Sequence, residues 1–344
     1  MKNLYKYISV SMLAVAAGFT SCHNGDIEFD DYEGGVSVYF PYQTPVRVLV
    51  MGEDTYNTDL DNAHKCKISG TMGGAYNGKN IKVDIAVDES LCENLYKEDG
   101  VTPIKAMPAS YYSLSSSTLD YNGNYTGSVE VTFSDEFFAD PNSVAGNYVI
   151  PVVMKSQTGA DRIIAGTYDT EIYSAAPSRL SDNWNDKPMD YTLFCVRYIS
   201  KYEGFFLRGI TSENGTAKTR EAGKTCIDDP IVYTKTVGLN KVIYGVEKET
   251  GTALEAGGKK YQLVLTFDDS QNCTVSAPEG VDYTATGSGN YGDHSEKLAW
   301  GNKDRDGLHL NYTVTIDGNN YSFEETLVLQ RRGVKKEDFK YVVK

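Results

Sequence analysis

Apolar residues recur at every second position in short segments from Val36 onward, a period that fits β-strands. In IKVDIAV (81–87), isoleucine and valine alternate with lysine, aspartate and alanine, so one face of the segment is apolar. SVEVTF (128–133) and LHLNYTVTI (308–316) repeat the pattern. No segment shows a sustained helical period. The chain is therefore predicted to be all-β, which excludes the α/β classes.

Residue pairs that favour tight turns lie between these segments. Asparagine or aspartate followed by glycine readily adopts the left-handed backbone of a two-residue hairpin turn. Such pairs, and one double glycine, occur at Asn77-Gly78, Asn122-Gly123, Asn214-Gly215, Gly257-Gly258 and Asp317-Gly318. Strands at this spacing with turn residues between them predict antiparallel sheets.

A stretch with two prolines and no periodicity, SAAPSRLSDNWNDKPMDY (174–191), divides the chain into two parts. Residues 36–178 are predicted to form an Ig-like antiparallel β-sandwich, and residues 179–190 a linker. Residues 191–344 have room for about eight strands, which predicts a lipocalin-like β-barrel. A second sandwich is the alternative for this half.

The first residues have the composition of a secretory signal peptide. Lys2 and Lys6 precede an uncharged run, ISVSMLAVAAGF (8–19), which is followed by small residues. The run is shorter than the ~20 apolar residues that a membrane-spanning helix needs. Residues 1–21 are therefore predicted to be removed on export.

Cys22 directly follows this predicted signal peptide. The preceding Thr20 and Ser21 resemble the small residues of a bacterial lipobox, a motif whose cysteine is acylated and becomes the first residue of the mature protein. Several acyl chains on one cysteine give a firm membrane anchor, because each buried CH₂ adds about 0.8 kcal/mol. Cys22 is predicted to carry the lipid, and residues 22–35, rich in acids, to form a tether.

The charge balance argues against nucleic acid as a partner. The chain has 47 acidic and 33 basic residues and a formal net charge of −14. It contains no run of five basic residues, whereas phosphate binding requires clusters of lysine and arginine. Its 26 tyrosines suit exposed β-strands, and a tyrosine ring can also pack on a sugar. A neutral partner such as a glycan is expected.

Five cysteines remain after Cys22, an odd number that cannot all pair within one chain. They show neither a CxxC pair nor the spacing of a Cys₂His₂ zinc site. We expect small buried hydrophobic residues, while a Cys66–Cys92 bridge stays open. No metal or cofactor is predicted.

Three further patterns indicate turns and loops more than chemistry. Gly287, Gly289 and Gly292 match GxGxxG, but without a βαβ context they predict a flexible loop. Residues 302–307 resemble half of a calcium loop that lacks the glutamate at position twelve, which favours a turn. The four histidines have no catalytic spacing, so no catalytic residue is assigned. A carboxylate pair for glycoside hydrolysis stays open, because its separation depends on the fold.

Four aromatic residues are the candidates for stacking on sugar rings. Trp184 lies in the polar segment DNWNDK and Trp300 lies before a polar turn, while Tyr283 and Tyr291 flank the glycine-rich segment. The alternatives are that Trp184 docks between the domains and that Trp300 belongs to the barrel core.

Several segments resemble two domains of Bacteroidetes surface lipoproteins. VYFPYQTPVRVLVMGED (38–54) and FFADPNSVAGNYVIPVVM (137–154) are similar to an N-terminal domain of unknown function that is shared with some family 18 endo-glycosidases. YEGFFLRG (202–209) and LAWGNKDRDGLHLNYTV (298–314) resemble a lipocalin-like domain that often follows it. The hydrolase barrel of the endo-glycosidases, and its catalytic signature, are absent from this sequence.

The resemblance implies a role in polysaccharide utilisation at the cell surface. The chain is expected to be a non-catalytic lipoprotein, anchored in the outer membrane and facing the exterior, that binds glycans beside an outer-membrane transporter. One alternative is a glycoside hydrolase with an unrecognised carboxylate pair. Another is a structural partner of the transporter, which predicts a flat apolar patch in place of a groove.

Overall fold

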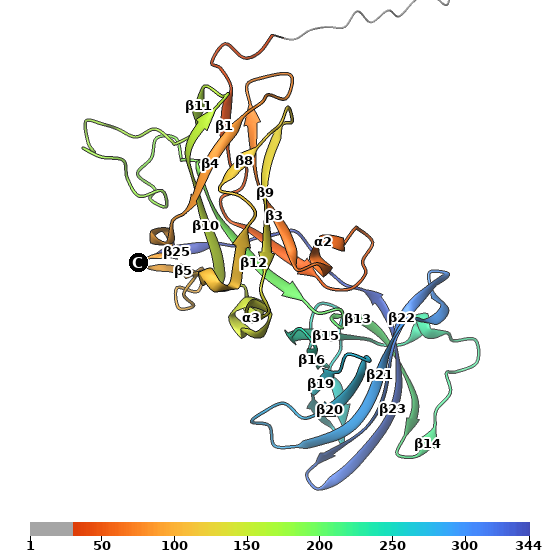
Figure 1. Ribbon diagram of the computed structural model, residues 1–344. Helices are drawn as coiled ribbons and strands as arrows, with labels where there is room; N and C mark the ends of the chain where they lie inside the picture. Colours follow the sequence, from red (N-terminus) through yellow and green to blue (C-terminus); the bar gives the residue numbers. More distant parts are fainter. Residues whose placement is uncertain (1–29) are drawn as a thin grey trace, which may run out of the picture.

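The computed structural model describes residues 30–344 and consists of two β-rich bodies, a sandwich and a barrel (Figure 1). The sandwich lies at the top of Figure 1 and the barrel at the lower right. The all-β prediction, with a barrel of eight antiparallel strands in the second half, is confirmed. The signal peptide and Cys22 lie outside the described residues.

The sandwich has two layers that β8 (Thr118–Asp120) connects. The first layer contains β1 (Ser37–Tyr39), β3 (Lys65–Gly73), β7 (Tyr112–Leu114), β9 (Thr126–Phe133) and β11 (Arg162–Ile163). The second contains β2 (Pro45–Val50), β4 (Lys82–Val87), β6 (Lys105–Ala106), β10 (Tyr148–Thr158), β12 (Tyr191–Ile199) and β24 (Glu337–Asp338). Short helices occupy the connections: α2 (Asp59–Asn62), η1 (Glu89–Cys92), η2 (Ala109–Tyr111), α3 (Asp135–Ala139) and α4 (Pro141–Ala145).

The inward-facing side chains of both layers form one apolar core. Period-2 alternation places them there, because every second residue of a strand points to the same side. Representative members from the two layers are Val38, Ile68, Val131, Ile85, Val152 and Val196, all at most 5% exposed. The alternating segments of the sequence therefore predict this core correctly.

The second layer is buried on its outer face as well. Val149, Val153 and Leu193 point away from the sandwich core, yet they form a second apolar cluster with Leu95. The chain's last strand, β25 (Tyr341–Val343), pairs with β5 (Leu95–Lys97) over this face. This double burial explains why β10 and β12 are apolar at nearly every position.

The location of β12 differs from the predicted domain boundary at residue 191. Tyr191–Ile199 pairs with β10 and β2 in the sandwich instead of starting the barrel. Near the chain's end, β24 pairs with β2. The barrel is thus inserted between two sandwich segments. A strand that is apolar on both faces shows no period-2 pattern. The sequence of β12 therefore does not reveal whether the strand belongs to the sandwich or to the barrel.

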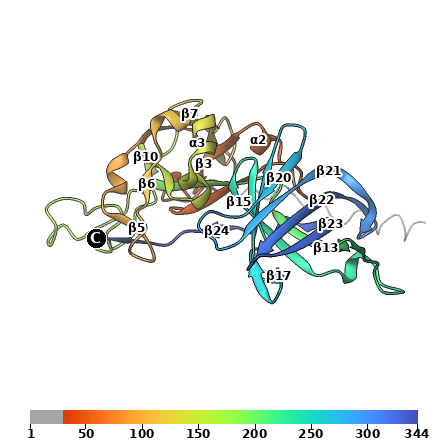
Figure 2. The same ribbon diagram turned by 90° about the horizontal axis from the view of Figure 1, so that it is seen from below.

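The barrel closes by antiparallel pairing of its first strand with its last. Its strands are β13 (Gly204–Glu213), β15 (Ile231–Gly238), β16 (Lys241–Tyr244), β19 (Leu263–Phe267), β20 (Asn272–Ser276), β21 (Thr284–Trp300), β22 (Lys303–Ile316) and β23 (Asn319–Arg331). β14 (Thr216–Ala217), η3 (Cys226–Asp228), β17 (Leu254–Ala256) and β18 (Lys259–Tyr261) extend from it. Figure 2 shows the barrel strands from below.

Side chains fill the barrel interior, as expected for eight strands. Besides aliphatic residues they include many aromatic ones, among them Phe206, Tyr244, Tyr261, Phe267, Tyr291, Tyr312 and Phe323. Among them lies an ion pair between Arg208 and Glu325, whose carboxylate is fully buried. Glu325 also accepts hydrogen bonds from the hydroxyls of Tyr244 (2.7 Å) and Tyr312 (2.8 Å). The carboxylate is therefore fully partnered inside an apolar barrel.

Four of the five predicted tight turns have the expected backbone. Both residues have positive φ at 122–123, 214–215, 257–258 and 317–318, as a type I′ turn requires. Asn77-Gly78 was predicted wrongly, since neither residue has a positive φ. Gly78 is needed for another reason, because a Cβ there would collide with the carbonyl oxygen of Gly123.

The GxGxxG segment is part of strand β21, so the predicted flexible loop is wrong. A Cβ at Gly287 would collide with the carbonyl of Asn311, and one at Gly289 with the carbonyl of His309. These glycines allow β21 to pass close to β22. The turn predicted at 302–307 is shorter and lies earlier: Gly301 and Asn302 have positive φ and join β21 to β22, while Lys303 to Gly307 already belong to β22.

The cysteines are free thiols within residues 30–344. Cys66 and Cys92 belong to different apolar clusters and form no bridge. Burial raises the pKa of Cys66 and of Cys195 to about 12. Both thiols therefore stay protonated at neutral pH, which agrees with the predicted role as small hydrophobic residues.

Breaking the buried ion pair tests the polar core of the barrel. Glu325→Gln leaves the guanidinium of Arg208 buried without a counter-charge, so we expect the free energy of unfolding to fall by about 3–5 kcal/mol. Urea denaturation followed by tyrosine fluorescence measures the change. The double variant Arg208→Met/Glu325→Leu buries no charge and should lose less. A double variant that loses as much as Glu325→Gln would contradict this account.

Candidate functional site

One outer surface of the barrel carries rows of uncharged polar side chains. It spans β20, β21, β22, β23 and the end of β13, and we call it the polar face. Its residues are Asn272, Thr274, Ser276, Thr286, Ser288, Asn290, His309, Asn311, Thr313, Ser322, Glu324, Thr326 and Ser212. Each alternates with a side chain that points into the barrel, so strand period fixes the orientation.

Strand register aligns these residues into rows across the strands. One row runs from Asn272 through Asn290 and His309 to Thr326. Directly opposite residues on antiparallel strands have their Cβ atoms about 4.5–5.5 Å apart. A row therefore presents neighbouring amide, imidazole and hydroxyl groups at a regular spacing.

The next row contains Thr274, Ser288, Asn311, Glu324 and Ser212. The side chains of Ser288, Asn311 and Glu324 make no hydrogen bond to any residue between 30 and 344. Their donors and acceptors are thus available to a ligand. Glu324 carries the one carboxylate of the polar face.

The polar face is hollowed into two adjoining depressions. The larger has a volume of about 640 Å³ and is lined by residues including Asn290, His309 and Thr326. The smaller, of about 440 Å³, is lined by residues including Asn214 and Ser322. Asn311 and Glu324 border both. Cavities of 300–1,000 Å³ are in the range of small-ligand sites, although this surface is unusually polar for one.

His309 is held in place from both sides. Its Nε2 lies 3.0 Å from Oε1 of Glu296, and its Nδ1 lies 3.3 Å from the hydroxyl of Thr326. Glu296 also accepts a hydrogen bond from the hydroxyl of Ser295. The imidazole is therefore an oriented group within the larger depression.

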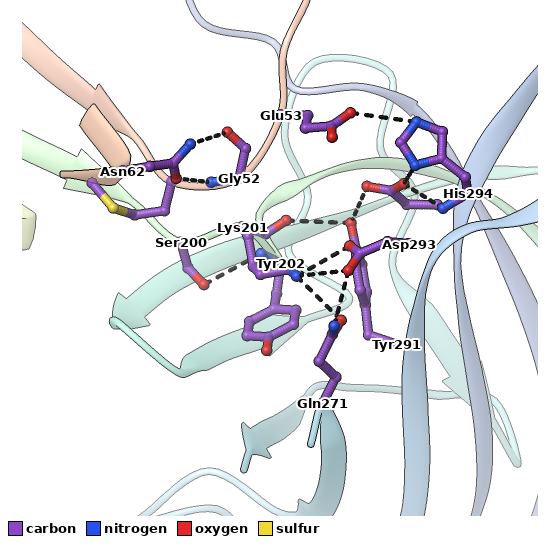
Figure 3. Close-up of polar contacts among 12 residues, drawn as sticks. Gly52, Glu53, Asn62, Ser200, Lys201, Tyr202, Gln271, Tyr291, Asp293 and His294 are labelled. Carbon is purple, nitrogen blue, oxygen red and sulfur yellow. Dashed lines mark hydrogen bonds and ion pairs between the residues drawn. The ribbon is translucent and has the colours of Figure 1, made fainter. Parts of the chain in front are cut away.

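A second polar cluster lies where the sandwich meets the barrel (Figure 3). Lys201 lies 3.1 Å from Asp293 and donates to Gln271, which in turn donates to Asp293. Across the domain boundary, Nε2 of His294 lies 3.3 Å from Glu53 of the sandwich. The backbone amide of His294 donates to Asp306. This cluster joins the two bodies by charge and hydrogen bonds.

Aromatic rings form the floor of this junction. Tyr202 stacks on Phe267 with ring centroids 3.6 Å apart. Tyr291 packs edge-on against Tyr202, and its hydroxyl donates to Asp306 over 2.7 Å. Burial, with Asp306 nearby, raises the pKa of Tyr291 well above its usual value. The hydroxyl therefore remains a donor. Burial opposes ionisation of Asp293, but hydrogen bonds from Gln271 and Lys201 lower its pKa overall.

Arg332 connects the domains through backbone groups. Its Nη2 donates to the carbonyls of Met51 (3.1 Å) and Ser200 (2.6 Å), and its Nη1 to that of Glu53 (3.4 Å). The residue is 6% exposed. One guanidinium, from the residue that directly follows the last barrel strand, thus satisfies three carbonyls at the ends of sandwich segments.

The four predicted sugar-stacking residues lie at separate places. Trp184 packs edge-on against Tyr168 in a sandwich loop, and its indole N–H donates to the carbonyl of Ser178. It contacts its own loop and does not dock between the domains. Trp300 ends β21, partly exposed, beneath the guanidinium of Arg305.

Tyr283 and Tyr291 flank a segment of strand β21 and not the predicted flexible loop. Tyr283 precedes β21, and its hydroxyl hydrogen-bonds the backbone of Gln262. Tyr291 lies mid-strand, 4% exposed, in the junction floor. Strand β21 extends between the two tyrosines, and Trp184 lies in a sandwich loop. The structure therefore does not assemble the four aromatic residues into one site.

Sequence reasoning missed the polar face, although a signal for it exists. The outward positions of β21 to β23 hold serine, threonine and asparagine, where lysine and glutamate are the usual choice for a solvated surface. The alternation predicts the inward-facing apolar residues, but the outward-facing polar residues were not considered as a surface. The rows themselves depend on register, which one strand's sequence does not contain.

Residues 30–344 contain neither a cluster suited to a metal ion nor a helix suited to a membrane. No group of three or more histidine, cysteine, aspartate or glutamate side chains is arranged to hold a metal ion. In the same residues no helix has the length and apolar character to cross a membrane.

Comparisons with known proteins identify both bodies as domains of unknown function. Residues 201–333 match the family described as Domain of unknown function (DUF5627), which corresponds to the barrel. Residues 30–161 match a family described as a "-like, N-terminal domain". No curated protein matches the chain.

Solved structures from Bacteroides ovatus resemble the chain. One, a protein of unknown function, is 33% identical, with a TM-score of 0.78, and the match covers 92% of this chain and 100% of that one. A multidomain protein including DUF1735 is 12% identical, with a TM-score of 0.39 and coverage of 86% and 94%. The identity and coverage of the first of these proteins show that this chain belongs to the same family.

Removing the Arg332 contacts tests how the domains are joined. Arg332→Met keeps an extended side chain but leaves buried carbonyls without a donor, so we expect the free energy of unfolding to fall by about 2–4 kcal/mol. Differential scanning calorimetry should then separate a sandwich transition from a barrel transition. Lys335→Met, which removes an exposed ion pair with Glu249, is the control and should change stability by under about 0.5 kcal/mol. Equal effects of the two substitutions would exclude the role assigned to Arg332.

Proposed function

The chain belongs to the family of the Bacteroides ovatus protein of unknown function, and we propose that it is a non-catalytic lipoprotein that binds glycans at the cell surface. It is anchored in the outer membrane through Cys22 and faces the exterior. There it captures glycan for a polysaccharide utilisation system, beside an outer-membrane transporter. The polar face of the barrel is the observation that carries the glycan-binding part of this proposal.

The chemistry of the polar face suits a neutral sugar. A glycan offers many hydroxyls, each both donor and acceptor, and asparagine, serine and threonine pair with such groups in either role. Asn311 and Ser288 have no partner among residues 30–344, and Glu324 adds a charged acceptor, which strengthens a hydrogen bond. The rows extend over five strands, so an oligosaccharide can lie across them.

Charge argues for a neutral glycan over an acidic one. The polar face holds no lysine or arginine, and its one formal charge is the carboxylate of Glu324. The whole chain carries a net charge of −14, which repels uronic acids and sulfated sugars at long range. Trp300, partly exposed at the end of β21, remains a candidate for additional stacking on the barrel.

Alanine substitutions in the two rows of the polar face test the binding site. Asn311→Ala and Asn290→Ala each remove one hydrogen-bonding partner of the sugar, so we expect affinity to fall about tenfold, near 1.4 kcal/mol. Binding of the full chain to an array of neutral oligosaccharides, followed by calorimetry on a bound sugar, measures the change.

The matched control is Asn183→Ala, an exposed asparagine in a sandwich loop, which should bind like the parent protein. Binding to none of the glycans would overturn the proposed function. Unchanged affinity of both polar-face variants would place the site elsewhere. Shortened sugars after incubation would favour the alternative, a glycoside hydrolase.

The anchor is tested separately at Cys22. Mass spectrometry of the mature N-terminus should find an acylated cysteine at this position, and the protein should fractionate with outer membranes. Cys22→Ser removes the thiol that carries the lipid, so the variant should appear in the soluble fraction. A mature protein that starts elsewhere, or an unmodified Cys22, would contradict the anchor.

A further inference from the structure

Three exposed tyrosines gather at the end of the sandwich opposite the barrel. Tyr32, Tyr76 and Tyr125 are 66%, 54% and 52% exposed. They come from three separate segments: the start of the described chain, the β3–β4 connection and the β8–β9 connection. We call this surface the tyrosine tip.

Backbone contacts hold the three segments together. The amide of Tyr32 donates to the carbonyl of Gly74, and the amide of Tyr76 donates to the carboxylate of Asp31. The hydroxyl of Tyr125 donates to the carbonyl of Tyr76 over 2.5 Å. Each tyrosine is therefore positioned relative to the others before any partner arrives.

Glycines make this assembly sterically feasible. A Cβ at Gly74 would collide with the carbonyl of Gly35, and one at Gly78 with the carbonyl of Gly123. The three segments thus pack backbone to backbone. Pre-organised loops lose less conformational entropy on binding, which favours a contact surface over a mobile loop.

The position of the tip relates it to the proposed anchor. The described chain enters the sandwich at this end, the top of Figure 1. Between Cys22 and Asp30 there are eight peptide steps, which cannot span more than about 28 Å. An anchored protein therefore keeps the tip within that distance of the bilayer.

We propose that the tyrosine tip contacts the headgroup region of the outer membrane and sets the orientation of the anchored protein. This inference rests on the lipid anchor of the proposed function. Tyrosine suits the site because it joins an apolar ring to a polar hydroxyl, and tyrosines are enriched at membrane–water interfaces. The junction and the barrel then extend away from the bilayer.

Charge at the tip selects the headgroup. Asp31 forms an ion pair with Lys79 at 2.6 Å, which balances one charge. Asp30 and Glu33 are exposed and repel an anionic surface. A zwitterionic headgroup such as phosphatidylcholine is therefore the expected partner.

Fluorescence quenching by brominated lipids tests the contact. The lipidated full chain carrying Tyr76→Trp is reconstituted into phosphatidylcholine vesicles, with and without lipids brominated near the headgroup. The added tryptophan should lose emission beyond the background of Trp184 and Trp300. Tyr125→Trp should behave in the same way. Val281→Trp, at an exposed position (39%) between β20 and β21 on the far end of the barrel, is the control and should not be quenched.

Two further measurements separate the alternatives. Mass spectrometry of the same sample detects acylation of Cys22, so failure of the anchor is distinguished from failure of the tip contact. Acylated protein without quenching at 76 or 125 overturns the inference. The triple variant Tyr32→Ser/Tyr76→Ser/Tyr125→Ser is tested on the glycan array. If it no longer binds, and the tryptophans at 76 and 125 are not quenched, the tip is reassigned to sugar recognition.

Discussion

The burial of the second sandwich layer on both of its faces determines the rest of the architecture. β10 and β12 are apolar on both sides, so they need a cover besides the first layer. The chain supplies it by returning after the barrel, when β24 pairs with β2 and β25 with β5. Apolar burial contributes about 25 cal/mol per Å², and this cover therefore favours a closed path in which the barrel is an insertion.

An inserted barrel has two covalent connections to the sandwich. They follow β12 and precede β24, and both pass the junction, where Lys201 and His294 (Figure 3) and the guanidinium of Arg332 make their contacts. Two connections and a buried guanidinium restrict rotation between the domains far more than a single linker does. The polar face thus has a defined direction relative to the tyrosine tip. Under the two proposals made above, the polar face would be presented outward while the tip faces the bilayer.

Sequence period predicted the parts of the fold that have one buried face. Ile68, Val131 and Leu310 alternate with polar residues and lie in the cores where they were expected. The place of β12 in the sandwich was not predicted, because its two faces are equally apolar. The glycines of β21 were not predicted to lie in a strand, because they are needed for the close approach of β22, which a single segment does not reveal. The polar face needed the register of five strands. The aromatic candidates, chosen by residue type alone, were not brought together.

The direction of the strands has a mechanical consequence. Under the proposed function, tension on a bound polysaccharide would load the protein between its lipid anchor and its barrel. That load draws β12 along its partners β10 and β2, so the hydrogen bonds of both ladders resist together in shear. Peeling the same strands apart would break those bonds one after another, at a lower force. Pairing along both edges of β12 therefore gives the sandwich mechanical resistance as well as a continuous sheet.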